Sequence, residues 1–280
     1  MKFLDINNCK IAYQEYNSHL PETLLFIHGN SHSSQSFINQ QTEDKLSHFR
    51  LIFIDLPGHG NSSPLENYSL PIFAKIINDF INKLGLVRYA IVGHSLGGHI
   101  GIHLLKESTP LGLFIVGTPP QRKPFSGEGF LSNTKASILN LPKASDEELQ
   151  ALCQEFQYND IDTSVFISDY KKTDPNFRVQ IIPSVLMGDY EDEVQILKNF
   201  QGVRFGIGSE NDLIVSSVYM KDVLDEVNGT FFLADGGHSS HATSAKKFNN
   251  LLNLFADKVF INHNSLLATG FETIEVLIGY

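Results

Sequence analysis

The amino-acid sequence predicts an α/β protein with a mostly parallel, doubly wound sheet of about eight strands, helices on both faces and an inserted helical lid. One observation is that short apolar runs alternate with segments of helical spacing through residues 1–118. Another is that this alternation lapses over residues 119–199, where the patterns are helical, and returns over residues 200–258. Strands joined by crossover helices pair in parallel, with helices on both faces. We therefore expect a core of residues 1–118 and 200–258 and a lid at residues 119–199.

Six strand-like runs come before the expected lid. The first two lie within residues 2–16 and flank Asn7-Asn8, which is a hairpin turn signal. The other four are short and apolar, as buried strands are, and occupy residues 23–27, 50–54, 88–92 and 113–116. Helical spacing connects these strands at residues 34–46 and 70–84.

The remaining elements follow the same patterns. In the expected lid, residues 146–156 and 160–170 are amphipathic helical segments, and Ser145 or Asp146 is suited to cap the first. Two more strand-like runs and two helical segments complete the core, at residues 203–207, 217–224, 230–234 and 243–255. Residues 259–280 form a C-terminal extension with further strand-like runs, and the sequence indicates no role for it.

Composition is that of an ordinary globular protein and argues against several functions. The 280 residues carry a formal net charge of −10, so we expect neither nucleic acid nor a membrane as a partner, because phosphate binding needs a cationic face. Cys9 and Cys153 have no neighbouring Cys or His, which indicates reduced thiols and no zinc site. No apolar run reaches membrane-spanning length, and the N-terminal run is broken at Asp5. We expect a cytoplasmic protein without cofactor or metal.

The sequence Gly93-His94-Ser95-Leu96-Gly97 lies between a strand-like run and a helical segment. A serine at the tip of such a turn has a strained backbone, and glycines two positions to either side let the strand and helix approach closely. The turn exposes the Ser95 hydroxyl, and the backbone N–H of Leu96 lies beside it at a helix N-terminus. Ser95 is therefore a candidate nucleophile, and the N–H of Leu96 is a candidate donor to an oxyanion.

Over residues 23–255 the chain resembles the α/β-hydrolase family. The resemblance rests on the Gly-x-Ser-x-Gly turn and on the blocks at residues 28–31 (His-Gly-Asn-Ser) and 55–62 (Asp-Leu-Pro-Gly-His-Gly-Asn-Ser), and the Pro and Gly of the latter favour a structural turn. It implies a triad in the chain order Ser, Asp, His, with the backbone N–H of Asn30 as the second oxyanion donor. Relatives that cleave carbon–halogen bonds hold halide with an asparagine at this position, but they carry aspartate where this chain has Ser95.

A serine hydroxyl needs a base to accept its proton, and eleven histidines compete for that role. His238 is the best placed, because it follows the last expected strand on the glycine-rich segment 235–237, at the strand ends where ligands gather in open parallel sheets. It also occupies the position of the base in the family. His241, three residues further on, is the alternative.

The base needs a carboxylate to orient it, and Asp212 matches the position where the family carries one. It lies on the loop that follows the expected strand at residues 203–207. Some relatives place the carboxylate after the strand that follows the nucleophile helix, but residues 117–120 (Gly-Thr-Pro-Pro) contain none. Glu210 is the competing residue.

Together these residues predict a serine hydrolase that cleaves a small or medium acyl ester with water. Ser95 attacks the carbonyl carbon, His238 relays the proton, and Asp212 orients His238. The same triad would serve a lactonase, a thioesterase, an amidase or a carbon–carbon bond hydrolase, and a ligand-binding receptor with vestigial hydrolysis is the alternative outside enzymes. The sequence leaves the substrate, the acyl chain length and the oligomeric state open.

Overall fold

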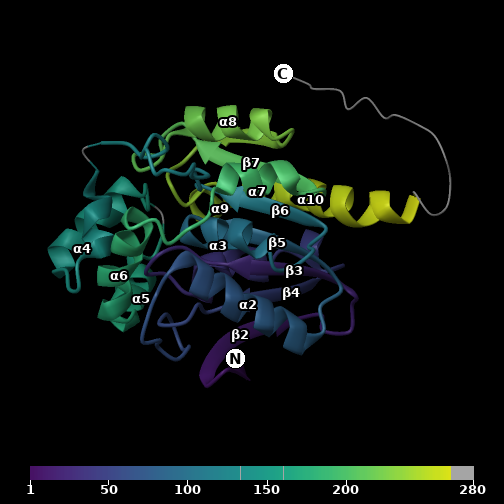
Figure 1. Ribbon diagram of the computed structural model, residues 1–280, viewed down its shortest axis with the longest axis horizontal. Coiled ribbons are helices and arrows are strands. Elements are labelled where there is room, and N and C mark those ends of the chain that lie inside the picture. Colours follow the sequence, from purple (N-terminus) through teal and green to yellow (C-terminus); the bar gives the residue numbers. More distant parts are fainter. Residues whose placement is uncertain (133, 160, 266–280) are drawn as a thin grey trace.

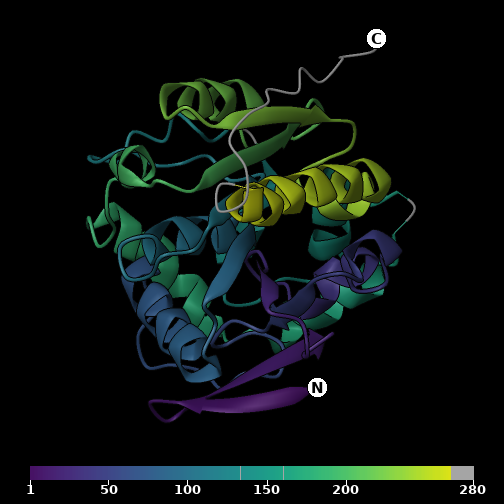
Figure 2. The same ribbon diagram turned by 90° about the vertical axis from the view of Figure 1, so that its right-hand side faces the viewer.

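The computed structural model describes residues 1–132, 134–159 and 161–265, shown from two sides in Figure 1 and Figure 2. Its centre is a sheet of eight strands: β1 (Lys2–Ile6), β2 (Cys9–Tyr16), β3 (Glu22–Ile27), β4 (Arg50–Ile54), β5 (Arg88–His94), β6 (Gly112–Val116), β7 (Val203–Ser209) and β8 (Thr230–Ala234). The strand order is β1-β2-β4-β3-β5-β6-β7-β8. Among these eight described strands, β1 with β2 and β2 with β4 pair antiparallel, and the other neighbours pair parallel. The predicted fold class is confirmed.

The strand register brings four loops to one edge of the sheet. Ile27 at the end of β3 pairs with Gly93 in β5, so the segment 28–31 and the turn at Ser95 leave the sheet side by side. Ser209 at the end of β7 pairs with Ala234 at the end of β8. Because all four strands run in the same direction, the loops after β3, β5, β7 and β8 meet at their carboxyl ends, where sites form in open α/β sheets.

Helices cover both faces of the sheet. Alternate residues of β3 enter different apolar clusters, since successive strand side chains point to opposite faces. One cluster also receives side chains from α2 (Leu70–Leu84), α3 (Leu96–Leu104) and α8 (Ser217–Glu226). The other receives side chains from η1 (Ser34–Phe37) and from α10 (Ala245–Ser265), the yellow helix in Figure 2.

One predicted helix is broken into shorter pieces, and another begins two residues later than predicted. The segment predicted at 34–46 forms η1, α1 (Ile38–Gln41) and η2 (Asp44–Leu46), because the Glu43 side chain caps a new turn by accepting from the N–H of Lys45. Of the helix predicted at 243–255, residues 245–255 lie in α10, whereas Thr243 ends the short helix α9 (Ser240–Thr243). The two helices are separated at Ser244, whose backbone is not helical (φ −128°, ψ 42°) and whose hydroxyl donates to the carbonyl of Asp235.

Between β6 and β7 the chain forms η3 (Lys135–Asn140), α4 (Asp146–Glu155), α5 (Thr163–Lys172), α6 (Pro175–Leu186) and α7 (Glu193–Asn199). We call η3, α4, α5 and α6 the inserted helices; Figure 1 shows α4, α5 and α6 grouped at one end of the sheet. Ser145 caps α4 in a capping box with Glu148. The sequence reading missed α6, although Asp174 followed by Pro175 is a helix start signal, and Asp174 does cap it.

Buried Arg178 holds the inserted helices together. Its guanidinium donates to the carbonyls of Leu141 (2.8 Å), Pro142 (2.9 Å) and Tyr170 (3.0 Å). It also stacks on the Tyr170 ring at 4.1 Å. One residue therefore ties α6 to the C-terminal part of α5 and to the loop after η3.

None of the described helices is both long and apolar enough to cross a membrane. Cys9 and Cys153 are buried free thiols. The first residues of the predicted extension continue α10 as far as Ser265, and the strand-like runs that the sequence reading noted at residues 266–278 lie outside the described residues.

Candidate active site

Ser95 lies between β5 and α3 in a strained backbone conformation, with φ of 50° and ψ of −116°. The turn is possible because glycine stands on either side of it. A Cβ at Gly97 would lie 2.1 Å from the carbonyl oxygen of Ile27, and a Cβ at Gly93 would lie 2.5 Å from that of Gly97. Close approach of α3 to β3 and β5 therefore requires glycine at both positions, and it leaves the serine side chain half-buried at the strand ends.

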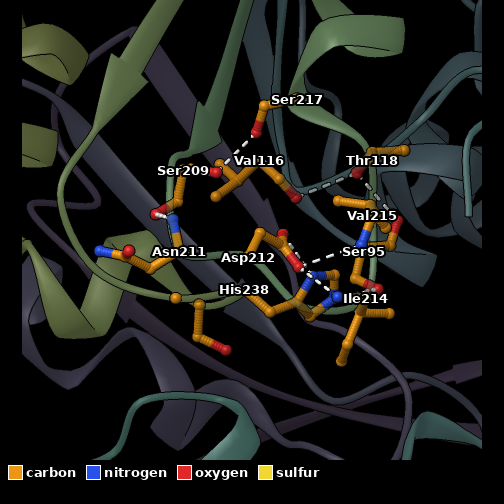
Figure 3. A network of polar contacts seen from close by, with 12 residues as sticks. Ser95, Val116, Thr118, Ser209, Asn211, Asp212, Ile214, Val215, Ser217 and His238 are labelled. Atoms are coloured by element: carbon orange, nitrogen blue, oxygen red, sulfur yellow. Dashed lines mark hydrogen bonds and ion pairs between the residues drawn. The ribbon is translucent and has the colours of Figure 1, made fainter. Parts of the chain in front are cut away.

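The structure brings together the hydroxyl, imidazole and carboxylate that the sequence reading singled out (Figure 3). The Oγ of Ser95 lies 3.0 Å from Nε2 of His238, and Nδ1 of His238 lies 2.9 Å from Oδ2 of Asp212. The other carboxylate oxygen of Asp212 accepts the backbone N–H groups of Ile214 (2.8 Å) and Val215 (3.0 Å). The carboxylate is thus held by its own loop with one oxygen facing the imidazole, which sets the tautomer with a free lone pair toward Ser95.

The competing residues lie elsewhere. Glu210 is exposed on the β7–α8 loop, and its backbone N–H donates to the carbonyl of Ala234. His241 is fully buried, with its ring centroid 4.7 Å from that of Phe37 and 4.5 Å from that of His94. Neither of these two side chains reaches the Ser95 hydroxyl.

Burial favours the neutral form of three histidines near the triad. Burial lowers the pKa of His32 and of His241 to about 3, and it lowers the pKa of His94 well below its usual range. The ring of His94 lies 5.2 Å from that of His238. Since these neighbours carry no charge near neutral pH, they do not repel an imidazolium that forms at His238.

The loop after β3 presents the backbone N–H of Asn30 beside the turn at Ser95. Nε2 of His28 accepts the backbone N–H of Leu56 at 2.9 Å, so Nδ1 carries the proton and donates to the carbonyl of Gly29 at 2.8 Å. That carbonyl and the N–H of Asn30 belong to the same peptide plane, which this bond holds in place. Within the described residues, neither this N–H nor that of Leu96 has an acceptor, so both are available to an oxyanion.

Tyr158, which follows α4, joins two loops of the site, and the sequence reading missed it. Its hydroxyl lies 3.0 Å from Nε2 of His32 and 2.7 Å from Oγ of Ser239, the residue after His238. Nδ1 of His32 lies 2.9 Å from the carbonyl of Asn30. Through His32, the hydroxyl of Tyr158 therefore connects the Asn30 loop to the His238 loop. No local pattern around Tyr158 in the sequence indicates this contact.

The predicted turn at residues 55–62 supports the same region from outside. Asp55 is fully buried, and it accepts the backbone N–H of Ser34 at 2.8 Å and that of Asn61 at 2.9 Å. It thereby fixes the start of η1 relative to β4. In the described part of the chain, no group of three or more His, Cys, Asp and Glu side chains could hold a metal ion.

The chain is similar in sequence and in fold to known proteins. The family model of the alpha/beta hydrolase fold matches residues 22–121. A crystal structure of the N-acyl homoserine lactonase AidH, in complex with N-hexanoyl homoserine lactone, superposes with a TM-score of 0.85 at 23% identity, covering 93% of this chain and 98% of that one. The protein named "Putative esterase/lipase 2" of Mycoplasma pneumoniae is 22% identical over 247 residues, which are 84% of this chain and 89% of that protein.

A more local match is to the dihydrolipoyllysine-residue acetyltransferase component of the acetoin cleaving system of Cupriavidus necator. It is 30% identical over 108 residues, which are 38% of this chain but span only 28% of that relative's length. The sheet topology, the family model and the whole-length superposition all indicate the same fold. The chain has the α/β-hydrolase fold.

Proposed function

We propose that this protein is a serine hydrolase that cleaves small or medium carboxylic esters through an acyl-enzyme intermediate. The observation that carries the proposal is the continuous chain of contacts from Asp212 through His238 to Ser95, next to two backbone N–H groups with no acceptor among the described residues. A relative named as an esterase/lipase and a structural neighbour that is a lactonase support the same class of bond.

The geometry supports the following reaction. His238 takes the proton of the Ser95 hydroxyl as the oxygen attacks the ester carbonyl carbon, and the N–H groups of Asn30 and Leu96 stabilise the oxyanion. His238 then returns the proton to the leaving alcohol, and the acyl group remains on Ser95. A water molecule, deprotonated by His238, attacks the acyl-enzyme, and His238 returns the proton to the Ser95 oxygen as the acid is released. Throughout, Asp212 orients the imidazole and stabilises its cation.

We propose that residues 119–199 act as a lid over this reaction. Phe156, after α4, stacks on the ring of His238 at 5.8 Å. Phe130 forms a β-bridge with Val215, three residues from Asp212, and the N–H of Leu131 donates to the carbonyl of Ile214 at 2.9 Å. Segments of the insertion thus contact the loops of both the base and the acid, so changes there would alter the substrates that fit.

A second candidate substrate is a lactone, which is a cyclic ester. The specific support is the superposition on a lactonase over nearly the whole of both chains. The chemistry at Ser95 is the same, except that the leaving alcohol stays attached to the acyl chain. A lactone and an open-chain ester would therefore compete for the same site.

The test is a panel of p-nitrophenyl esters of graded acyl length and N-acyl homoserine lactones, assayed on the wild type and on Ser95→Ala. We expect multiple turnovers by the wild type and loss of at least 10³-fold in kcat for the variant. Both proteins should unfold at similar temperatures, because Ala removes only the hydroxyl. Unchanged hydrolysis by Ser95→Ala would remove the proposal, and a single slow turnover by the wild type would favour a ligand-binding receptor.

A further inference from the structure

A cleft with a volume of about 140 Å³ lies between the η1–α1 segment and α5. Its walls are mostly apolar, formed by Ile38, Ile161, Val165, Phe166 and the ring of Tyr158. Two of its lining residues, Ile38 and Val165, are 49% and 41% exposed, so the cleft reaches the surface. Apolar cavities of about this size hold a single benzene ring, so the cleft has room for one aromatic ring or a short alkyl chain.

The cleft is separate from the candidate active site. No member of the triad lines it, nor does Asn30 or Leu96. His32 and Tyr158 form part of its lining, and their rings contact those of His94 (5.6 Å) and Phe156 (5.4 Å). These latter two rings pack in turn against His238. A layer of buried rings therefore stands between the cleft and the triad.

Among the described residues, the two charged side chains that line the cleft are both acidic. Asp169, on α5, is 6% exposed and accepts a hydrogen bond from the hydroxyl of Ser33 at 2.6 Å. Asp162, which caps α5, is the other. The lining contains no lysine or arginine, and Asp169 forms no ion pair within the described residues.

The buried carboxylate of Asp169 forms no ion pair that would offset the cost of burying its charge. Burial raises the pKa of Asp169 to about 6, despite the hydrogen bond from Ser33 and the charge of Lys172, and the charge of Asp55 adds to the rise. A cationic group placed in the cleft would stabilise the ionised carboxylate, whereas a carboxylate ligand would be repelled by it. The charge of the cleft thus excludes the acid product of ester hydrolysis and favours an amine.

We propose that this cleft is a second small-molecule site, which takes an apolar group about the size of one aromatic ring that carries a protonated amine. The apolar group packs against Phe166 and Val165, and the ammonium group donates to the carboxylate of Asp169. This inference concerns binding alone and stands independently of the reaction at Ser95.

The test uses three probes with the same ring and different head groups: benzylamine, benzyl alcohol and benzoate, titrated calorimetrically into the full chain at pH 7.5. We expect benzylamine to bind, benzyl alcohol to bind at least tenfold more weakly, and benzoate to show no binding. Two substitutions then locate the site. Asp169→Asn keeps the shape of the side chain and should weaken benzylamine about tenfold, and Ala242→Leu fills the cleft and should abolish binding.

Asp225→Asn is the matched control, because Asp225 is an exposed carboxylate on α8, outside the cleft. It should leave the affinity for benzylamine unchanged. Thermal unfolding verifies that each variant is folded. If Ala242→Leu fails to fold, the proposal is still tested by the order of the three probe affinities for the wild type and by the affinity of Asp169→Asn for benzylamine. The proposal is overturned if benzoate binds as well as benzylamine, if none of the probes binds, or if Asp169→Asn leaves the affinity unchanged.

Discussion

Asp212→Asn provides the sharpest test of the candidate triad, because the structure determines how the new amide must sit. Oδ1 of Asp212 accepts two backbone N–H groups, from Ile214 and Val215, whereas Oδ2 faces Nδ1 of His238. An amide NH₂ cannot occupy the Oδ1 position, where it would face two donors. The amide oxygen must take that place, and the NH₂ group must then point at His238.

The consequence is the wrong histidine tautomer. Facing a donor, Nδ1 of His238 has to accept, so the ring proton moves to Nε2, which then cannot take the proton of Ser95. Loss of the corresponding carboxylate in a serine protease lowers kcat about 10⁴-fold, equivalent to about 5.5 kcal/mol of activation free energy. We expect a fall of this order in kcat for p-nitrophenyl butyrate, with KM changed less than about threefold.

The control is Glu210→Gln, which removes the other carboxylate of the same loop. Glu210 is exposed, so its substitution should leave kcat within about twofold. Asp212→Asn should keep nearly the wild-type unfolding temperature, because the bonds from the N–H groups of Ile214 and Val215 are retained. The reasoning fails if Asp212→Asn keeps more than a tenth of the wild-type kcat, or if Glu210→Gln lowers kcat as much as Asp212→Asn does.

Two further substitutions probe contacts found only in the structure. Tyr158→Phe removes the hydroxyl between His32 and Ser239. We expect kcat to fall severalfold with a smaller change in KM, and the free energy of unfolding to fall by about 1 kcal/mol. Steady-state kinetics in which only KM rose would contradict a positioning role. Glu193→Gln removes the charge of a fully buried carboxylate whose Oε2 lies 2.8 Å from Nδ1 of His99 on α3. This substitution should lower the free energy of unfolding by about 3 kcal/mol at pH 7. Although burial alone would raise it, two neighbouring histidines of α3 lower the pKa of Glu193 to about 2. The contribution of Glu193 to stability is therefore full above pH 4.5 and is lost as the pH falls toward 2. Urea titrations at a series of pH values should show the difference in the free energy of unfolding between wild type and variant shrinking over that range. A difference that stays constant would refute the assignment.

Local patterns predicted the elements that are long or strongly apolar. The core strands were recognisable because buried parallel strands are continuous apolar runs, and α2 because its spacing is regular and Gly85 ends it. The prediction of a single helix over residues 34–46 was wrong, because the Glu43 side chain caps a new turn there. The division into core and lid stays a prediction, with α6 now added to the inserted helices.

The candidate site shows the same division. Ser95 was identifiable because the residues that shape its turn are its immediate neighbours in the sequence. The sequence reading preferred Asp212 and His238 to Glu210 and His241 by resemblance and loop position, and the structure places the preferred pair against Ser95. Their catalytic roles await the substitutions above.

The sequence by itself determined which segments are strands, where the chain turns sharply at Ser95, and which residue types could supply a base and an acid. Those features depend on neighbours a few positions apart, where steric fit and side-chain period act directly. Only the tertiary structure decided that Tyr158 bridges two loops of the site and that Asp169 lines an apolar cleft. Contacts between residues tens to over a hundred positions apart arise when the sheet register and the inserted helices are set, and no local pattern encodes that distance.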